Sequence, residues 1–279
     1  MTHKWLTKHS KAKLNLFLHI IGRKNNGLHL IESFFVLLHE LYDIIKVRNS
    51  NSSQCTVVGQ NIHGKNIAIT TLEAMQHFAP SMSVEIEIQK QIPIGAGLGG
   101  GSSNAATLMI LLNQLWNLNL TVPQLQQIAT SIGADVPFFL HQDNAFVSNT
   151  GETITHCQIG ISSHMLVVYP MFPISTKDVY QISVQSFRQP LSQLSKVNLI
   201  EAIVRGQNDL QQAAIRLEPQ LTDLIDYMSK QEGVITTSMS GSGSACFSSF
   251  QNKEKATLAL QRLRNKYPRF FLHYEEISI

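Results

Sequence analysis

The sequence has few cysteines, and their spacing matches neither a metal site nor a disulfide framework. Cys55, Cys157 and Cys246 are the three in 279 residues, and no Cys-x-x-Cys pair occurs. This pattern argues against a structural zinc site and against a fold held by disulfides. Buried, reduced thiols in a reducing compartment are the simple interpretation.

Long apolar runs are also missing. No stretch approaches the ~18–20 apolar residues that a membrane-spanning helix needs. The first residues, MTHKWLTKHSKAK, lack the hydrophobic segment of a secretory signal. We therefore expect a soluble, cytoplasmic protein that does not bind a membrane.

Charge is scarce and evenly spread. Charged residues make up 15% of the chain, and the formal net charge is +3. The basic residues form no single concentrated cluster, so a nucleic-acid partner is not expected. Apolar residues make up 43%, which is enough for an ordered core.

The periodicity of apolar residues predicts an α+β fold with hairpins and helices. In KLNLFLHI, residues 13–20, apolar positions alternate with positions that include Lys13, Asn15 and His19, which indicates a strand with a core face and a partly polar face. A polar stretch at 148–163 suggests a boundary between two domains, 1–155 and 156–279. The predicted strands lie at 28–38, 43–48, 54–58, 83–88, 165–169, 234–239, 245–250 and 269–274, with an extended segment at 136–147, and the predicted helices lie at 65–79, 102–118, 121–133, 176–183, 197–205, 209–217, 219–231 and 252–266.

The most informative segment is a glycine-rich loop between a predicted strand and a predicted helix. Glycine occupies five of the seven positions from 95 to 101, which allows backbone N–H groups to approach an anion closely. The helix that follows adds the positive end of its dipole. The loop is predicted to bind the phosphates of ATP through Pro93, Ile94, Gly95, Ala96, Gly97, Leu98, Gly99, Gly100, Gly101, Ser102 and Ser103. Ser102 or Ser103 can cap the helix or bind phosphate or Mg²⁺, although the Mg²⁺ ligands stay unassigned.

Three other interpretations compete for this loop. A dinucleotide fingerprint requires an acidic residue about 20 positions further on, and none occurs between Ile88 and Ala134. A Walker loop requires Gly-Lys-Ser/Thr, whereas Gly101 is followed directly by Ser102. A purely structural turn would lose backbone entropy for no evident packing gain. Because no Lys or Arg occurs from Gln91 to Thr176, the cation for the phosphates has to come from elsewhere, and Lys13 is the candidate.

Three motifs in this order resemble those of the GHMP kinases, which include galactokinase, homoserine kinase and mevalonate kinase. They are AKLNL around Lys13, the loop PIGAGLGGGSSNA, and GADVPF around Asp135. A further segment, SGSGS at 240–244, resembles what is called the third motif of the superfamily. AKLNL and GADVPF resemble in particular the GHMP kinase of the non-mevalonate (methylerythritol phosphate) isoprenoid precursor pathway. The resemblance covers nearly the whole chain.

The resemblance implies a two-domain GHMP kinase fold with the active site in the cleft between the domains. It implies ATP as co-substrate with Mg²⁺, and transfer of phosphate to the 2-hydroxyl of a cytidine-diphosphate-linked methylerythritol. By position in the motifs, Asp135 corresponds to the general base and Lys13 to its partner. A carboxylate can take the proton of the alcohol as the new bond forms, and a lysine can keep that carboxylate ionised.

The same resemblance implies the residues that bind the substrate. His29 corresponds to the histidine that contacts cytosine, and Leu28 stands where the family has an aromatic residue. Tyr180 corresponds to the aromatic on the other side of the base. The further substrate-binding candidates are Asn15, Thr176, Gly241, Ser242 and Gly243.

Two other functions stay open from the sequence. One is another GHMP small-molecule kinase, of the mevalonate or homoserine kinase type, against which AKLNL and His29 argue. The other is a catalytically silent nucleotide-binding protein on the same fold, against which the presence of Lys13 and Asp135 argues. A monomer and a weak homodimer are equally compatible with the sequence.

Overall fold

The chain forms two compact units, and each is assembled from separate stretches of sequence. The computed structural model describes residues 4–60, 66–183, 186–191 and 195–279. The first unit comprises Met1–Ala12, Glu40–Ile94 and Gly99–Asp143, and the second comprises Lys13–His39, Gly95–Leu98 and Asn144–Ile279. The sequence-based division at residue 155 is a single cut, whereas these units interleave along the chain, and that division stays a prediction.

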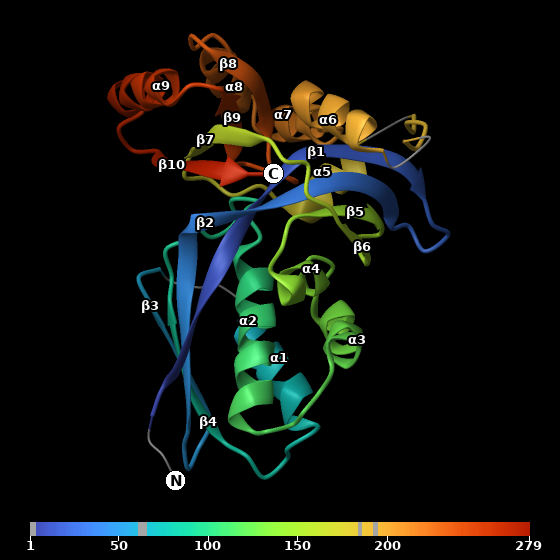
Figure 1. Cartoon of the computed structure of the whole chain (residues 1–279), viewed down its shortest axis with the longest axis vertical. Coiled ribbons are helices and arrows are strands. Elements are labelled where there is room, and N and C mark those ends of the chain that lie inside the picture. The colour runs from blue at the N-terminus through green and yellow to red at the C-terminus, as the bar shows by residue number, and fades with distance from the viewer. Residues whose placement is uncertain (1–3, 61–65, 184–185, 192–194) are drawn as a thin grey trace. The chain divides into compact units, whose positions relative to one another are not determined.

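Two long strands, β1 (Leu6–Arg23) and β2 (His29–Asn49), pair with each other and contribute residues to both units. In the first unit, the C-terminal part of β2 runs antiparallel to β4 (Val84–Gln89), and β4 runs parallel to β3 (Gln54–Val58). Figure 1 shows the helices of this unit on one side of these strands. The helices are α1 (Ile67–Gln76), α2 (Gly100–Leu115), α3 (Val122–Ile132) and α4 (Val136–His141).

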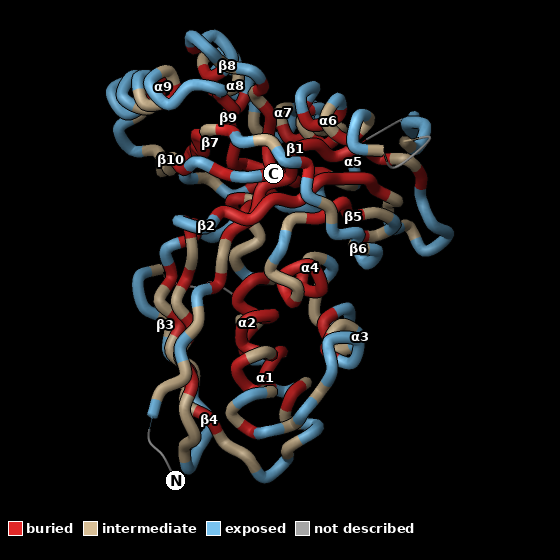
Figure 2. The backbone as a smooth tube through the Cα atoms, viewed as in Figure 1, coloured by how far each residue is buried: buried red, intermediate tan, exposed pale blue. Residues whose placement is uncertain are grey.

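Helix α2 is the central helix of the first unit and packs against α1, α3 and α4. Most of its length is buried, as the red stretch of the tube in Figure 2 shows. The sequence predicted this burial, and it is confirmed. A capping box formed by Thr121 and Gln124 begins α3, so the predicted start of that helix is also confirmed.

The second unit contains an antiparallel sheet in the order β10-β7-β9-β8. In the same unit, the N-terminal part of β2 pairs with β5, and β5 pairs with β6. The strands are β5 (Ala145–Asn149), β6 (Thr153–His156), β7 (Ser162–Tyr169), β8 (Val234–Met239), β9 (Cys246–Phe250) and β10 (Phe271–Ser278). The helices are α5 (Thr176–Ile182), α6 (Lys196–Arg205), α7 (Gln211–Leu217), α8 (Gln220–Ser229) and α9 (Lys253–Lys266).

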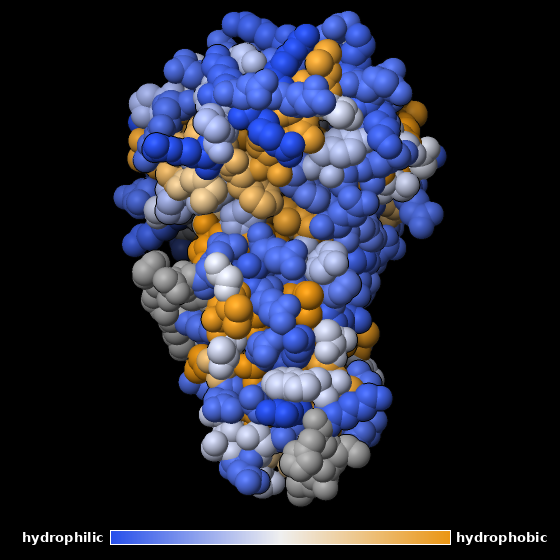
Figure 3. Space-filling model, turned by 90° about the vertical axis from the view of Figure 1, so that its left-hand side faces the viewer, coloured by the Kyte–Doolittle hydropathy of each residue, from blue (hydrophilic) through white to orange (hydrophobic). Residues whose placement is uncertain are grey.

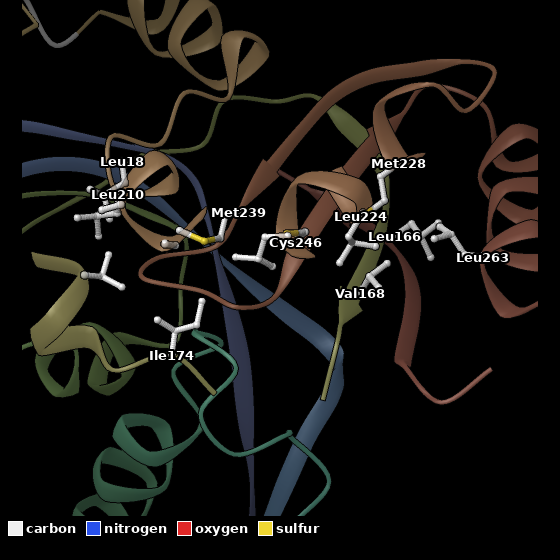
Figure 4. Close-up of a cluster of buried hydrophobic side chains, with 14 of the residues drawn as sticks. Leu18, Leu166, Val168, Ile174, Leu210, Leu224, Met228, Met239, Cys246 and Leu263 are labelled. Atoms are coloured by element: carbon white, nitrogen blue, oxygen red, sulfur yellow. The ribbon is translucent and has the colours of Figure 1, made fainter. Parts of the chain in front are cut away.

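An apolar cluster of the second unit joins its sheet to its helices. Figure 4 shows side chains from β7, α8 and α9 converging, among them Val168, Leu224, Met228 and Leu263. Cys246 is part of this cluster, and burial raises the pKa of its thiol to about 12. This cysteine is therefore a buried, protonated thiol, as the sequence suggested, whereas Cys55 and Cys157 are only partly buried.

Several details differ from the sequence-based expectation, and one is that β6 lies within the polar stretch at 148–163. The predicted strands at 28–38 and 43–48 are one continuous strand, β2. The predicted extended segment at 136–147 contains the short helix α4 before β5 begins. Gly99, rather than a serine, is the N-cap of α2. Both faces of β1 are buried near Lys13, because Lys13 and Asn15 are only 3% and 2% exposed.

The described part of the chain has no helix that is both long and apolar enough to cross a membrane. Figure 3 shows polar side chains over much of one face of the molecule, with apolar atoms between them.

Candidate active site

The second unit brings a buried lysine against the middle of the glycine-rich loop. The ammonium of Lys13 contacts Asn15 Oδ1 and donates to the carbonyl oxygen of Gly97 at 3.1 Å. The backbone N–H of Lys13 donates to the carbonyl of Leu98 at 3.0 Å. The ammonium also lies 4.9 Å from the ring centroid of Phe35. A lysine that is 3% exposed and held by this many contacts is not an ordinary surface residue.

A second glycine-rich turn, at 240–244, packs against Lys13, Asn15 and Gly97. Gly241 packs so closely that a Cβ atom there would lie 3.0 Å from Asn15 Oδ1 and 3.3 Å from Lys13 Nζ. A Cβ on Gly97, whose φ is +80°, would lie 2.6 Å from the Ser240 carbonyl oxygen. The N–H of Ala245 donates to the Ala96 carbonyl at 2.9 Å. The two turns therefore fit together only because they carry no side chains at these positions.

The substrate-binding candidates lie in the second unit as well. The hydroxyls of Thr176 and Ser242 are 2.8 Å apart, which joins the start of α5 to the second glycine-rich turn. The rings of His29 and Tyr180 lie 5.2 Å apart between centroids, at 35° to each other. Leu28 is 54% exposed beside His29. Thr176 and Tyr180 are four residues apart on α5, so they share one face of that helix.

His29 is neutral at pH 7. Burial lowers the pKa of its imidazole below the ordinary value of 6.5, and the positive charge of Arg23 lowers it further. A neutral imidazole carries one donor nitrogen and one acceptor nitrogen.

The remaining candidates lie in the first unit. Asp135 is the N-cap of the short helix α4, directly before its buried apolar turn, and its side chain is half-buried. Ser102 is partly exposed on the first turn of α2, whereas Ser103 is buried and accepts a hydrogen bond from Ser10 Oγ at 2.8 Å. Gly101 is exposed. Of the two serines, Ser102 is therefore the more accessible one.

A protein-only Mg²⁺ site is not present among the described residues, because no group of three or more His, Cys, Asp or Glu side chains could hold a metal ion.

The sequence did not indicate two sets of residues that support the glycine-rich turns. Asn208 donates to the carbonyls of Met239 and Gly241 at 2.7 and 2.8 Å, which supports the second glycine-rich turn. In the first unit, a buried network of Asp43, Lys90 and Asn104 lies against the flanks of the first loop. One signal was available for Asp43, since it occupies an apolar-face position in the alternating stretch that buries Leu41, Ile45 and Val47.

Comparison with known families agrees with these features. Residues 66–143 match the GHMP kinases N terminal domain, and residues 191–269 match the GHMP kinases C terminal domain. The fold is shared with a crystal structure of homoserine kinase from Cytophaga hutchinsonii, with a TM-score of 0.71, 17% identity, and coverage of 100% of this chain and 96% of that chain. The class is therefore defined: the chain is a small-molecule kinase of the GHMP type, and GHMP kinases use ATP as co-substrate.

More similar proteins narrow the class. A 4-diphosphocytidyl-2-C-methyl-D-erythritol kinase from Chlorobium luteolum is 34% identical over 278 residues, which are 94% of this chain and 95% of that protein. The same kinase from Variovorax paradoxus is 35% identical, over 89% of this chain and 88% of that protein. A crystal structure of 4-(cytidine 5'-diphospho)-2C-methyl-D-erythritol kinase aligns with a TM-score of 0.79 and 30% identity, over 96% of this chain and 98% of that chain. The chain belongs to the 4-diphosphocytidyl-2-C-methyl-D-erythritol kinase family.

Proposed function

We propose that this protein transfers the γ-phosphate of ATP to the 2-hydroxyl of 4-diphosphocytidyl-2-C-methyl-D-erythritol, in the non-mevalonate route to isoprenoid precursors. The observation that carries the proposal is that Lys13 and Asn15 lie against two glycine-rich turns, at Gly97 and at Gly241. The chain also belongs to a family of kinases that are named after this substrate.

In the proposed reaction, Asp135 is the general base. Its carboxylate takes the proton of the 2-hydroxyl as the new O–P bond forms, and the bond from the γ-phosphorus to the bridging oxygen of ADP breaks. Lys13 offsets negative charge on the phosphoryl group that is being transferred and favours the ionised form of Asp135. Its fixed position, held by the Gly97 carbonyl, supports this role, since a preorganised cation does not have to reorient during the reaction.

The glycine-rich loop supplies the contacts to ATP. Residues 93–103 offer backbone N–H groups and the start of α2, and Ser102 is the side chain best placed to bind Mg²⁺. When bound, Mg²⁺ neutralises charge on the β- and γ-phosphates.

The substrate's cytidine portion serves as a handle in this proposal. His29 offers a neutral donor and acceptor to the edge of cytosine, and Tyr180 covers one face of the base. Thr176, Ser242 and Asn15 bind the remainder of the substrate, since the Thr176–Ser242 contact and the close fit of Gly241 to Asn15 bring their polar groups to one region of the second unit.

Asp135→Asn tests the assignment of the base. This variant keeps the size of the side chain but removes its ability to accept a full proton. We expect a fall in kcat of about 10²–10⁴-fold, with ATP affinity and thermal stability close to those of the wild type. Asp143→Asn is a matched control, because Asp143 is an exposed aspartate of the same unit. Turnover near the wild-type rate in Asp135→Asn would show that another group takes the proton.

A further inference from the structure

A closed network of buried polar side chains lies in the first unit at the flanks of the glycine-rich loop. Asp43 on β2, Lys90 after β4 and Asn104 on α2 are 0%, 7% and 3% exposed. Lys90 forms an ion pair with Asp43 and donates to Asn104 Oδ1 at 3.2 Å. Asn104 Nδ2 in turn donates to Asp43 Oδ2 at 2.8 Å. Each member of the network therefore contacts the other two.

This network is attached to both ends of the loop. The second carboxylate oxygen of Asp43 accepts hydrogen bonds from the backbone N–H groups of Gln91 and Ile92, at 2.7 and 2.9 Å. These residues directly precede Pro93, where the loop begins. At the other end, Asn104 lies in the second turn of α2 and also donates to Ser10 Oγ at 2.9 Å. Asp43 therefore fixes the entry of the loop directly and its exit through Asn104.

The network also explains why position 100 carries glycine. A Cβ atom on Gly100 would lie 2.9 Å from Ile92 Cγ2 and 3.3 Å from Lys90 Nζ. The first turn of α2 therefore sits directly against the ammonium of Lys90. At Gly101 the nearest atom to such a Cβ would be Ile67 Cγ2, at 3.8 Å, so that position is open.

Stability alone is a weak reason to keep a buried ion pair, because the cost of removing two charges from water often equals or exceeds their attraction. The contacts of this pair are instead directed at one segment, the loop that binds ATP in the proposed function. We propose that Asp43, Lys90 and Asn104 are positioning residues that hold the two ends of the glycine-rich loop in its nucleotide-binding geometry, an inference that rests on the proposed function. Lys90 acts within this network and not as a ligand of the phosphates.

The double variant Asp43→Asn/Lys90→Met tests the proposal. Asparagine keeps an acceptor for the backbone N–H groups of Gln91 and Ile92, and neither replacement leaves a buried charge. We expect the KM for MgATP to rise about tenfold, because donors that are no longer held in place bind phosphate less well, while the KM for the cytidyl alcohol changes less than about twofold. The control is Lys46→Met/Glu87→Gln, which removes a cross-strand ion pair of 2.9 Å between β2 and β4 in the same unit. Its KM for MgATP should equal that of the wild type.

A milder variant keeps the test decisive if the double variant does not fold. Asn104→Ser leaves the Asp43–Lys90 pair intact and removes the hydrogen bonds that join Asn104 to that pair and to Ser10. We expect its KM for MgATP to rise about threefold or more with the KM for the alcohol unchanged. Folded variants that lose stability but bind MgATP as well as the wild type would overturn the positioning role and leave the proposed function standing. A wild-type protein that does not bind MgATP would overturn both.

Discussion

Asn15 has two distinct tasks in the second unit. Its side-chain oxygen contacts the ammonium of Lys13, while its Nδ2 donates to Ser33 Oγ at 3.0 Å and its backbone N–H donates to Ser240 Oγ at 3.2 Å. The hydrogen bonds to Ser33 and Ser240 therefore fix the Asn15 amide, and the fixed amide in turn orients the Lys13 ammonium. A substitution at Asn15 should accordingly affect the position of Lys13 as well as substrate binding.

The state of His29 leads to a prediction about pH. Burial and the charge of Arg23 lower the pKa of His29 below the ordinary value of 6.5, so the neutral ring is the form present at pH 7. The imidazolium form can donate but cannot accept a hydrogen bond. We therefore expect the KM for the cytidyl substrate to stay constant from about pH 8 to about pH 6.5 and to rise below that.

The control for this prediction is His29→Gln, which keeps a donor and an acceptor but does not titrate. Its KM should be higher at every pH and should lack the increase in acid. An increase of the same size in the variant would assign the titration to another group.

The sequence predicted some candidate residues and missed others for a physical reason. His29 and Tyr180 were expected together from motifs alone, and their rings do lie in contact range. The partners Asp43 and Lys90 are 47 positions apart, and Asp43 and Asn104 are 61 apart. Such pairings depend on strand register and helix packing, which local patterns do not reveal.

At the scale of elements, the errors of the sequence analysis concern β2 and α4. His39 and Glu40 are exposed in the middle of β2, between the two strands that were predicted, and the strand continues through them. In α4, the six residues VPFFLH are too few to show a helical period, although Pro137 at its start is typical of a first helical turn. The predicted bounds of β8, β9 and α9 agree with the structure to within one residue, whereas β7 begins earlier than predicted and β10 extends from Phe271 to Ser278 instead of 269–274.

Gly100 and Gly101 make a matched pair at the start of α2. Gly100→Ala should lower the free energy of unfolding by ~1–3 kcal/mol, because the new methyl group meets the buried Ile92 side chain at 2.9 Å. Gly101→Ala should raise it by ~0.5–1 kcal/mol, because alanine reduces the entropy of the unfolded chain at an open helical position. Urea unfolding of both variants measures the difference. Equal effects at the two positions would contradict the close packing described for Gly100.

At the scale of the whole molecule, the glycine-rich loop belongs to both units. Pro93 and Ile94 are part of the first unit, Gly95–Leu98 of the second, and Gly99 onward of the first again. Lys13 and the turn at 240–244 contact the middle of this loop, whereas the Asp43 network contacts its flanks. The composition of the chain predicted an ordered protein and the periodicity of its apolar residues an α+β fold, but the interleaving of the two units follows from β1 and β2 passing through both.

The most direct test of the central claim is ADP release in the presence of MgATP and one alcohol at a time. The alcohols are 4-diphosphocytidyl-2-C-methyl-D-erythritol, mevalonate and homoserine, the last two representing other GHMP kinases. We predict release with the cytidyl compound alone, and loss of that release in Asp135→Asn. Release with mevalonate or homoserine and none with the cytidyl compound would contradict the proposed substrate and the roles of His29 and Tyr180, and release with none of the three would contradict the kinase activity itself.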